Sequence, residues 1–162
     1  MALLSPEQRA TLYVWFFGKT KIPMLAYCRP RVLELTSDRC AVQIRLRRRT
    51  RNHLRSMYIG VFTIGADLAG GLIAMDIIRQ EQLNMAPVFK DFTADFLRRA
   101  ESAVTFTCRE GPAIRQAIQE ALTSGERVNL PLRISATVQE NGETIPVAEM
   151  ALTLSLKQRG ES

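Results

Sequence analysis

The stretch that decides the fold is "NHLRSMYIGVFTIGADLAGGLIAMDII", which runs from Asn52 to Ile78. From Ile59 onward it is almost entirely apolar or glycine, with two acids, Asp67 near its middle and Asp76 near its end. Its length would suit a membrane span, for which about 20 apolar residues suffice. The glycines and the central carboxylate argue against that, because an aspartate at the centre of a membrane helix is costly. We therefore predict a helix buried on nearly all sides inside the protein.

The segments around this helix alternate between apolar and polar residues, which predicts half-buried strands. The expected strands cover approximately residues 31–36, 40–46, 92–96, 104–108, 128–138 and 146–156. The dipeptide Asn141-Gly142 is a hairpin signal between the last two. Alternation gives each strand one dry and one wet face, which suits an antiparallel sheet. The predicted class is α+β, with a curved antiparallel six-stranded sheet wrapped around the long central helix.

Two further helices are expected. A Ser-Pro-Glu-Gln capping box at residues 5–8 begins an N-terminal helix that should stop by Gly18 and continue as a loop. A short amphipathic helix occupies approximately residues 112–122, since its apolar positions follow the helical repeat. With no internal repeat or linker, the chain reads as a single domain over residues 1–162. Within it, residues 1–29 hold the N-terminal helix and loop, and residues 30–158 hold the core.

Composition sets broad limits on function. The 162 residues fit one domain, and the net charge of +6 suits nucleic acid, an anionic surface, a phosphorylated ligand or solubility alone. Three scattered cysteines and one histidine provide no zinc-site spacing, so no metal is expected. An odd number of cysteines favours a reducing compartment. The N-terminus does not read as a signal peptide, and we expect a cytoplasmic protein that does not enter a membrane.

The element order and one motif resemble the hotdog-fold acyl-CoA thioesterases. Many members carry a pattern close to N-x-H-G-x-x-H-G-G followed by six residues and an acid. Here Gly60 precedes Asp67 by seven residues and follows Asn52 by eight, and both spacings match the pattern. Tyr58-Ile59-Gly60 stands where the family has His-Gly-Gly. The resemblance is therefore to a divergent thioesterase-like branch of unknown function.

This resemblance implies a thioester hydrolase acting on an acyl-CoA or acyl-carrier-protein substrate. Asp67 would be the general base or nucleophile, the Gly60 amide would polarise the carbonyl, and Asn52 would orient water or substrate. Thr63 and Tyr58 are candidates for lining the substrate site. The family's sites lie across a subunit interface, which implies a homodimer or tetramer. No cofactor is implied beyond the coenzyme A that the substrate carries.

Helical spacing adds an argument from the residues themselves. Asp67 shares a helix face with Gly60, Thr63 and the glycine pair 70–71. Small residues let a ligand or a partner helix approach closely. Apolar surroundings should raise the pKa of the carboxyl, which suits a base near neutral pH. The alternative is a buried acid hydrogen-bonded to Thr63, to a backbone amide or to an interface partner.

Two alternative functions stay open. The missing His-Gly-Gly suggests a non-catalytic dimer that binds an acyl group or acyl-CoA. Hotdog β-hydroxyacyl dehydratases pair a histidine with an acid 14 residues later, as His53 and Asp67 are spaced here. However, Phe62 occupies the position of that family's Pro-Gly turn. His53 is otherwise a candidate substrate-binding residue or a loop histidine with a local hydrogen bond.

A basic run, "RLRRRTRNHLR", covers residues 45–55. Strand alternation places Arg45, Arg47 and Arg49 on a wet face, where they would be solvated or would capture the phosphates of coenzyme A. Nucleic acid is disfavoured because no aromatic residues interleave with the arginines as stacking platforms. Arg98 and Arg99, which follow the third predicted strand, are further candidates for phosphate binding.

Overall fold

The computed structural model describes residues 4–159, so the outermost residues of the predicted 1–162 domain lie outside the described part. Four helices and six strands follow one another in these residues. In chain order they are α1 (Pro6–Thr20), α2 (Pro23–Cys28), β1 (Arg31–Leu35), β2 (Cys40–Ile44), α3 (Ile59–Gln80), β3 (Met85–Phe96), β4 (Val104–Cys108), α4 (Gly111–Ser124), β5 (Val128–Glu140) and β6 (Glu143–Gln158).

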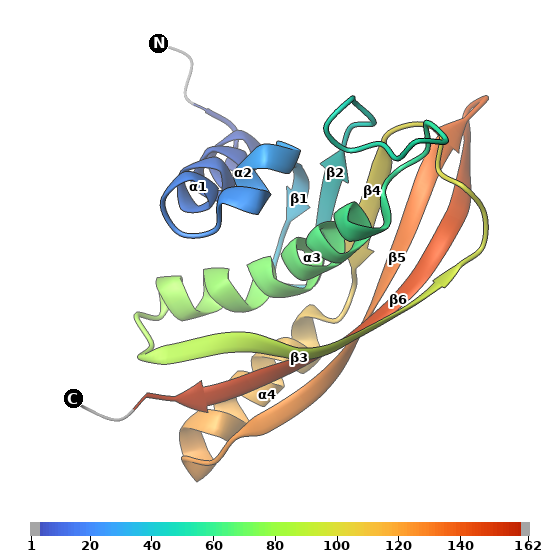
Figure 1. Ribbon diagram of the computed structural model, residues 1–162. Helices are drawn as coiled ribbons and strands as arrows, with labels where there is room; N and C mark the ends of the chain where they lie inside the picture. Colours follow the sequence, from blue (N-terminus) through green and yellow to red (C-terminus); the bar gives the residue numbers. More distant parts are fainter. Residues whose placement is uncertain (1–3, 160–162) are drawn as a thin grey trace.

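The six strands form one antiparallel sheet in the order β1-β2-β4-β5-β6-β3. The sheet curves around α3, which confirms the predicted α+β class (Figure 1). The predicted hairpin between β5 and β6 is also confirmed, because Asn141 and Gly142 both have positive φ angles, 50° and 82°. Positive φ at both central residues is what a tight two-residue hairpin of this kind requires.

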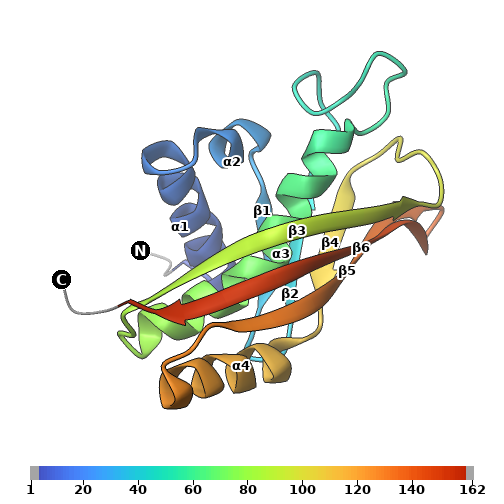
Figure 2. The same cartoon turned by 60° about the horizontal axis from the view of Figure 1, so that its bottom comes forward.

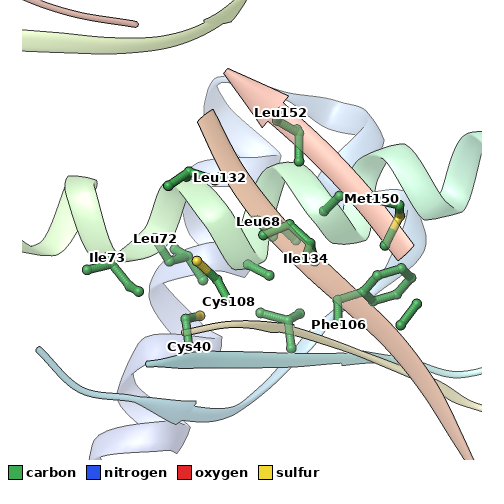
Figure 3. Close-up of a cluster of buried hydrophobic side chains, with 14 of the residues drawn as sticks. Cys40, Leu68, Leu72, Ile73, Phe106, Cys108, Leu132, Ile134, Met150 and Leu152 are labelled. Atoms are coloured by element: carbon green, nitrogen blue, oxygen red, sulfur yellow. The ribbon is translucent and has the colours of Figure 1, made fainter. Parts of the chain in front are cut away.

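Helix α3 is the central element of the core. Its side chains pack with those of the sheet in a layer that contains Leu68, Leu72, Phe106 and Ile134 (Figure 3). An 18-residue window of α3 has a mean hydropathy of 1.7, which would suit a membrane span. However, 67% of that window is buried inside the protein. The predicted buried helix is therefore confirmed.

The N-terminal region differs from the prediction beyond the start of α1. The capping box is present, with Ser5 N donating to Gln8 Oε1 at 2.8 Å and Gln8 N donating to Ser5 Oγ at 3.3 Å. However, α1 continues past Gly18 to Thr20, and the predicted loop contains the short helix α2. Gly18 is a contact residue rather than a terminator, because a Cβ there would lie 2.7 Å from the Ala26 nitrogen in α2.

The strand limits also differ from the sequence prediction. β3 begins at Met85, before the predicted start at 92, and β2 ends at Ile44. The hydroxyl of Thr11 in α1 accepts a hydrogen bond from Val32 N at 2.9 Å, so α1 shields the β1 edge. β3 forms the opposite edge of the sheet and pairs only with β6 among the strands of residues 4–159. Figure 2 shows α1 and α2 on one side of the molecule and α4 on the other.

Candidate functional site

Asp67 lies in the third turn of α3 and is half-buried. It lines a pocket of about 460 Å³ between α1, α2, α3 and β3. The pocket follows α3 from Asp67 to Arg79, which are 12 residues apart and therefore roughly 18 Å apart along the helix axis. Most of its other lining side chains are apolar, among them Val14, Phe17, Leu25, Leu68, Leu72, Met75, Ile78 and Phe89. The result is a largely apolar pocket with the Asp67 carboxylate at one end and Arg79 at the other.

Burial raises the pKa of the Asp67 carboxyl above its ordinary value of 3.8. Desolvation is the cause, because removing water disfavours the charged form, and no charge or hydrogen bond from residues 4–159 offsets it. This confirms the predicted direction. It also disfavours the alternative in which a local hydrogen bond to Thr63 satisfies the acid. The carboxylate oxygens are left able to accept a proton from a ligand or water.

Tyr58, Gly60 and Thr63 lie toward the N-terminus of α3. Tyr58 caps the helix through its backbone, and its exposed ring covers Gly60, where a Cβ would lie 2.8 Å from a ring carbon. Gly60 is in the first turn, where helix amides have no intrahelical acceptors. Thr63 is exposed on the same side of the helix. None of these three residues lines the Asp67 pocket.

The glycine pair 70–71, which was predicted to share the Asp67 face, packs against side chains of the sheet. A Cβ on Gly70 would lie 3.2 Å from Leu132 and 3.3 Å from Phe89, and one on Gly71 would lie 3.5 Å from Phe89. Gly71 nevertheless lines the Asp67 pocket, and Gly60 is covered by the Tyr58 ring, so Thr63 is the exposed member of the predicted small-residue face. Asp67 lies between Thr63 and the glycine pair that packs against Phe89.

Asn52 and His53 belong to the loop before α3. The Asn52 side-chain oxygen accepts hydrogen bonds from Leu54 N (2.9 Å) and from the amide and hydroxyl of Ser56 (3.1 and 3.2 Å). These contacts close the loop and leave the Asn52 amide nitrogen as its remaining polar group. His53 is exposed, and the structure does not bring it into the Asp67 pocket.

Arg98 and Arg99 lie just beyond β3 and are exposed. Arg98 forms an ion pair with Glu140 at 3.1 Å, and Arg99 lies 3.7 Å from Glu101. Both contacts are at the surface, where ion pairs contribute little. Neither arginine reaches the Asp67 pocket. Within residues 4–159 there is no cluster of three or more histidine, cysteine or acidic side chains that could hold a metal ion.

The pocket walls supplied by α1 and α2 were missed at the sequence level. Tyr13 and Phe17 of α1 lie one helical turn apart, with ring centroids 6.1 Å from each other, and both line the pocket. Their i, i+4 spacing marks an apolar helix face, which was visible in the sequence. The sequence did not indicate that this face packs beside Asp67, because α1 and α3 are far apart in the chain.

The fold places the chain among the hotdog proteins related in structure to thioesterases. Its sequence matches the family described as "Domain of unknown function (DUF4442)" over residues 11–156, and the chain belongs to that family. The comparison with curated proteins gives no match.

Solved structures similar to this chain cover nearly its full length. A Pseudomonas aeruginosa protein of unknown function, described as a probable thioesterase, is 25% identical with a TM-score of 0.74, covering 92% of this chain and 96% of its own. A protein of unknown function from Chlorobaculum tepidum is 10% identical with a TM-score of 0.79, covering 94% and 97%. A thioesterase from Haemophilus influenzae is 16% identical with a TM-score of 0.64, covering 99% and 95%.

Proposed function

We propose that this protein hydrolyses an acyl thioester and that Asp67 is the general base or the nucleophile. The observation that carries the proposal is a half-buried carboxylate with a raised pKa at one end of an apolar pocket. Such a pocket accepts an acyl chain through burial of apolar surface. The likeness to structures described as thioesterases supports the same chemistry. The substrate class is an acyl-CoA or an acyl-carrier-protein thioester.

The chemistry needs no resident cofactor. As a general base, Asp67 takes a proton from water while the water oxygen attacks the thioester carbonyl carbon. The tetrahedral intermediate collapses, the carbon–sulfur bond breaks, and Asp67 returns the proton to the leaving sulfur. As a nucleophile, the carboxylate attacks the carbonyl carbon and displaces the thiolate, and water then hydrolyses the resulting anhydride. A raised pKa suits the base role, because it brings the carboxyl closer to the working pH.

Gly60 and Asp67 of one chain are poorly placed to act on the same carbonyl. Seven residues of helix separate them by roughly 10 Å along the axis, whereas an oxyanion donor and a base must each come within about 3 Å of the reacting group. A second copy that brought its Gly60 amide next to this chain's Asp67 across a two-fold axis would complete the site. We therefore include a homodimer, or a tetramer built from such dimers, in the proposal.

The open edge of the sheet supports this assembly. β3 is a 12-residue edge strand, and an exposed edge of that length can pair with another strand. Apolar side chains are exposed along and beside it, with Val88 at 50%, Phe96 at 47% and Ile59, at the start of α3, at 58%. Exposed apolar groups that gather beside an open edge favour a partner surface.

The three cysteines are free and buried, which is compatible with work in a reducing cytoplasm.

The test is release of free thiol from a panel of acyl-CoA and acyl-carrier-protein thioesters. Asp67→Asn should lower kcat/KM by about 100- to 10,000-fold, the usual contribution of a general base. Asp76→Asn is the matched control, because Asp76 lies on the same helix but pairs with Arg79 at 2.7 Å. Wild-type kcat/KM should also fall as the pH drops through the raised pKa of Asp67. Full activity in Asp67→Asn would refute the proposed role.

The non-catalytic acyl binder is the second candidate, favoured by the separation of Gly60 from Asp67 in one chain. It predicts saturable binding of acyl-CoA with no thiol release by wild-type protein. The dehydratase alternative requires His53 beside Asp67, and the exposed loop position of His53 gives it no support. Hydration of a 2-enoyl-CoA that is lost in His53→Gln would be needed to restore it.

A further inference from the structure

A second and larger groove lies on the other side of α1 from the Asp67 pocket. It has a volume of about 1180 Å³ and is bounded by α1, the start of β1, the end of β2 and the turn at residues 45–50. Val14 and Phe17 of α1 face the Asp67 pocket, while Leu12 and Trp15 face the groove. The two spaces are therefore separate sites, and the groove is not explained by the proposed hydrolysis.

The groove is strongly basic. Five arginines line it against a single acid, Glu7, and they are Arg29, Arg31, Arg45, Arg47 and Arg49. All five are exposed, and within residues 4–159 none of them forms an ion pair. The side chain of Arg49 donates to Tyr27 O at 3.3 Å and lies over the Tyr27 ring. Cations gathered in one concavity repel one another, so an anionic ligand would relieve a cost that the free protein carries.

The backbone that carries these arginines is held in place. β2 ends at Ile44, so the arginine run is a turn rather than the strand expected from its alternation. The buried Thr50 hydroxyl donates to Arg45 O at 2.7 Å and accepts from Arg47 N at 2.8 Å. Both bonds involve only the backbone of the arginines, which leaves their guanidinium groups available. A fixed turn with available guanidinium groups is suited to phosphate, which arginine binds through paired hydrogen bonds.

The opposite wall supplies an aromatic surface. Trp15 of α1 is 47% exposed at the groove, next to Leu12 at 54%. The Lys19 ammonium lies 5.4 Å from the Trp15 ring centroid. A nucleobase that stacks on the indole therefore takes the other ring face or displaces this flexible side chain, while the arginines of the same groove hold its phosphates. We propose that this groove binds the phosphate groups of a nucleotide, with the base against Trp15. The nucleotide end of coenzyme A has this chemistry, and so does a free nucleotide, but the site itself stands whether or not Asp67 hydrolyses a thioester.

Trp15 makes the test direct because it is the only tryptophan in the chain. Adenosine 3′,5′-bisphosphate, adenosine diphosphate and coenzyme A are titrated into the wild-type protein at low ionic strength, with tryptophan fluorescence and calorimetry as readouts. We expect saturable binding and a change in Trp15 emission. Arg45→Gln/Arg47→Gln should weaken binding roughly tenfold or more, since charge-assisted contacts to phosphate are lost. The backbone hydrogen bonds of residues 45 and 47 to Thr50 remain in this double variant, so the fold should be kept.

Arg48→Gln/Arg51→Gln is the matched control. It removes the same charge from the same segment, but neither residue lines the groove. Binding should be nearly unchanged in this variant. Equal weakening in both double variants would overturn the proposal, because it would indicate a general electrostatic field. Absence of saturable binding, or stronger binding to duplex DNA or to phosphatidylglycerol vesicles than to any nucleotide, would overturn it too. Thiol release measured on the same variants tests the Asp67 site separately.

Discussion

The two sides of helix α3 differ in what they contact. On the sheet side, Gly65 is packed so closely that a Cβ there would overlap the ring of Phe106, which is itself fully buried. On the other side, toward the helix N-terminus, Gly60, Thr63 and Asp67 keep access to solvent or to the pocket. Both glycines admit an aromatic ring, but the two rings differ in burial. Phe106 beside Gly65 is fully buried in the core, whereas Tyr58 beside Gly60 is exposed.

This difference separates residues that make the fold from residues that could do chemistry. The sheet side is closely packed, and the apolar surface buried there stabilises the folded protein. The open side keeps a desolvated carboxylate, which burial destabilises and which no charge or hydrogen bond within residues 4–159 compensates. An uncompensated acid is hard to explain as a stabilising feature. A functional role for Asp67 explains why the helix tolerates it.

Truncating the sheet side should have the largest effect on stability. Phe106→Ala should lower the free energy of unfolding by about 3–5 kcal/mol, because it removes a fully buried ring and leaves a cavity under α3. Thr63→Ala, on the exposed side of the same helix, should change it by less than about 0.5 kcal/mol. Chemical denaturation of both variants measures the contrast. Similar losses in the two variants would mean that the open side is also a packed surface, covered by a partner.

Adding a methyl group on the sheet side should have a smaller effect. Gly65→Ala should cost about 1–3 kcal/mol, because the new Cβ overlaps the Phe106 ring and the helix must shift. The same change in a Phe106→Leu background should cost less, since the ring is gone. A double-mutant cycle measures this coupling. Independent, additive losses would show that the ring is not what limits residue 65.

The fold could be predicted because its signals are local and repeated. The apolar run of α3, the alternation in β5 and β6, and the Asn141-Gly142 turn each determine one element by itself. The errors in the predicted elements lie where tertiary contacts, rather than the local sequence, determine where a helix or strand begins and ends. Gly18 resembles a helix stop but is buried against Ala26. The six residues of α2 are too few for a periodic pattern, and β3 begins earlier because its first half pairs with the end of β6.

The candidate site was predictable only at its centre. The position of Asp67 in an apolar run was enough to indicate a raised pKa. Its pocket depends on Tyr13 and Phe17, at least 50 residues upstream, and spacing within one helix contains no information about them. Phosphate capture by the arginine run was among the sequence-level alternatives, but the groove wall that Trp15 of α1 supplies was missed for a similar reason. Sequence alternation put Arg45 and Arg47 on a strand, whereas hydrogen bonds to Thr50 hold them in a turn that lines the same groove as Trp15.

The smallest expected effect is a gain of stability from removing the Asp67 charge. Below the ordinary carboxyl pKa of 3.8, folded and unfolded chains both hold the proton, and burial costs nothing in charge. As the pH rises beyond that value the unfolded chain loses its proton first, because the pKa of folded Asp67 is raised. Stability therefore falls with pH until the folded carboxyl has also ionised. Above that pH the full free-energy cost of burying the ionised Asp67 carboxylate lowers the stability of the folded protein.

Asp67→Asn should consequently melt at a higher temperature than wild type at neutral pH, and the difference should shrink toward zero below pH 3.8. Thermal melts of both proteins across this pH range measure it. Asp76→Asn should give no such gain, because that acid is paired with Arg79 and hydrogen-bonded to Gln80 at 2.6 Å. A gain for Asp67→Asn that is independent of pH would trace to packing rather than charge. Lost hydrolysis together with pH-dependent added stability would show that α3 keeps its acid for chemistry, at the expense of the fold.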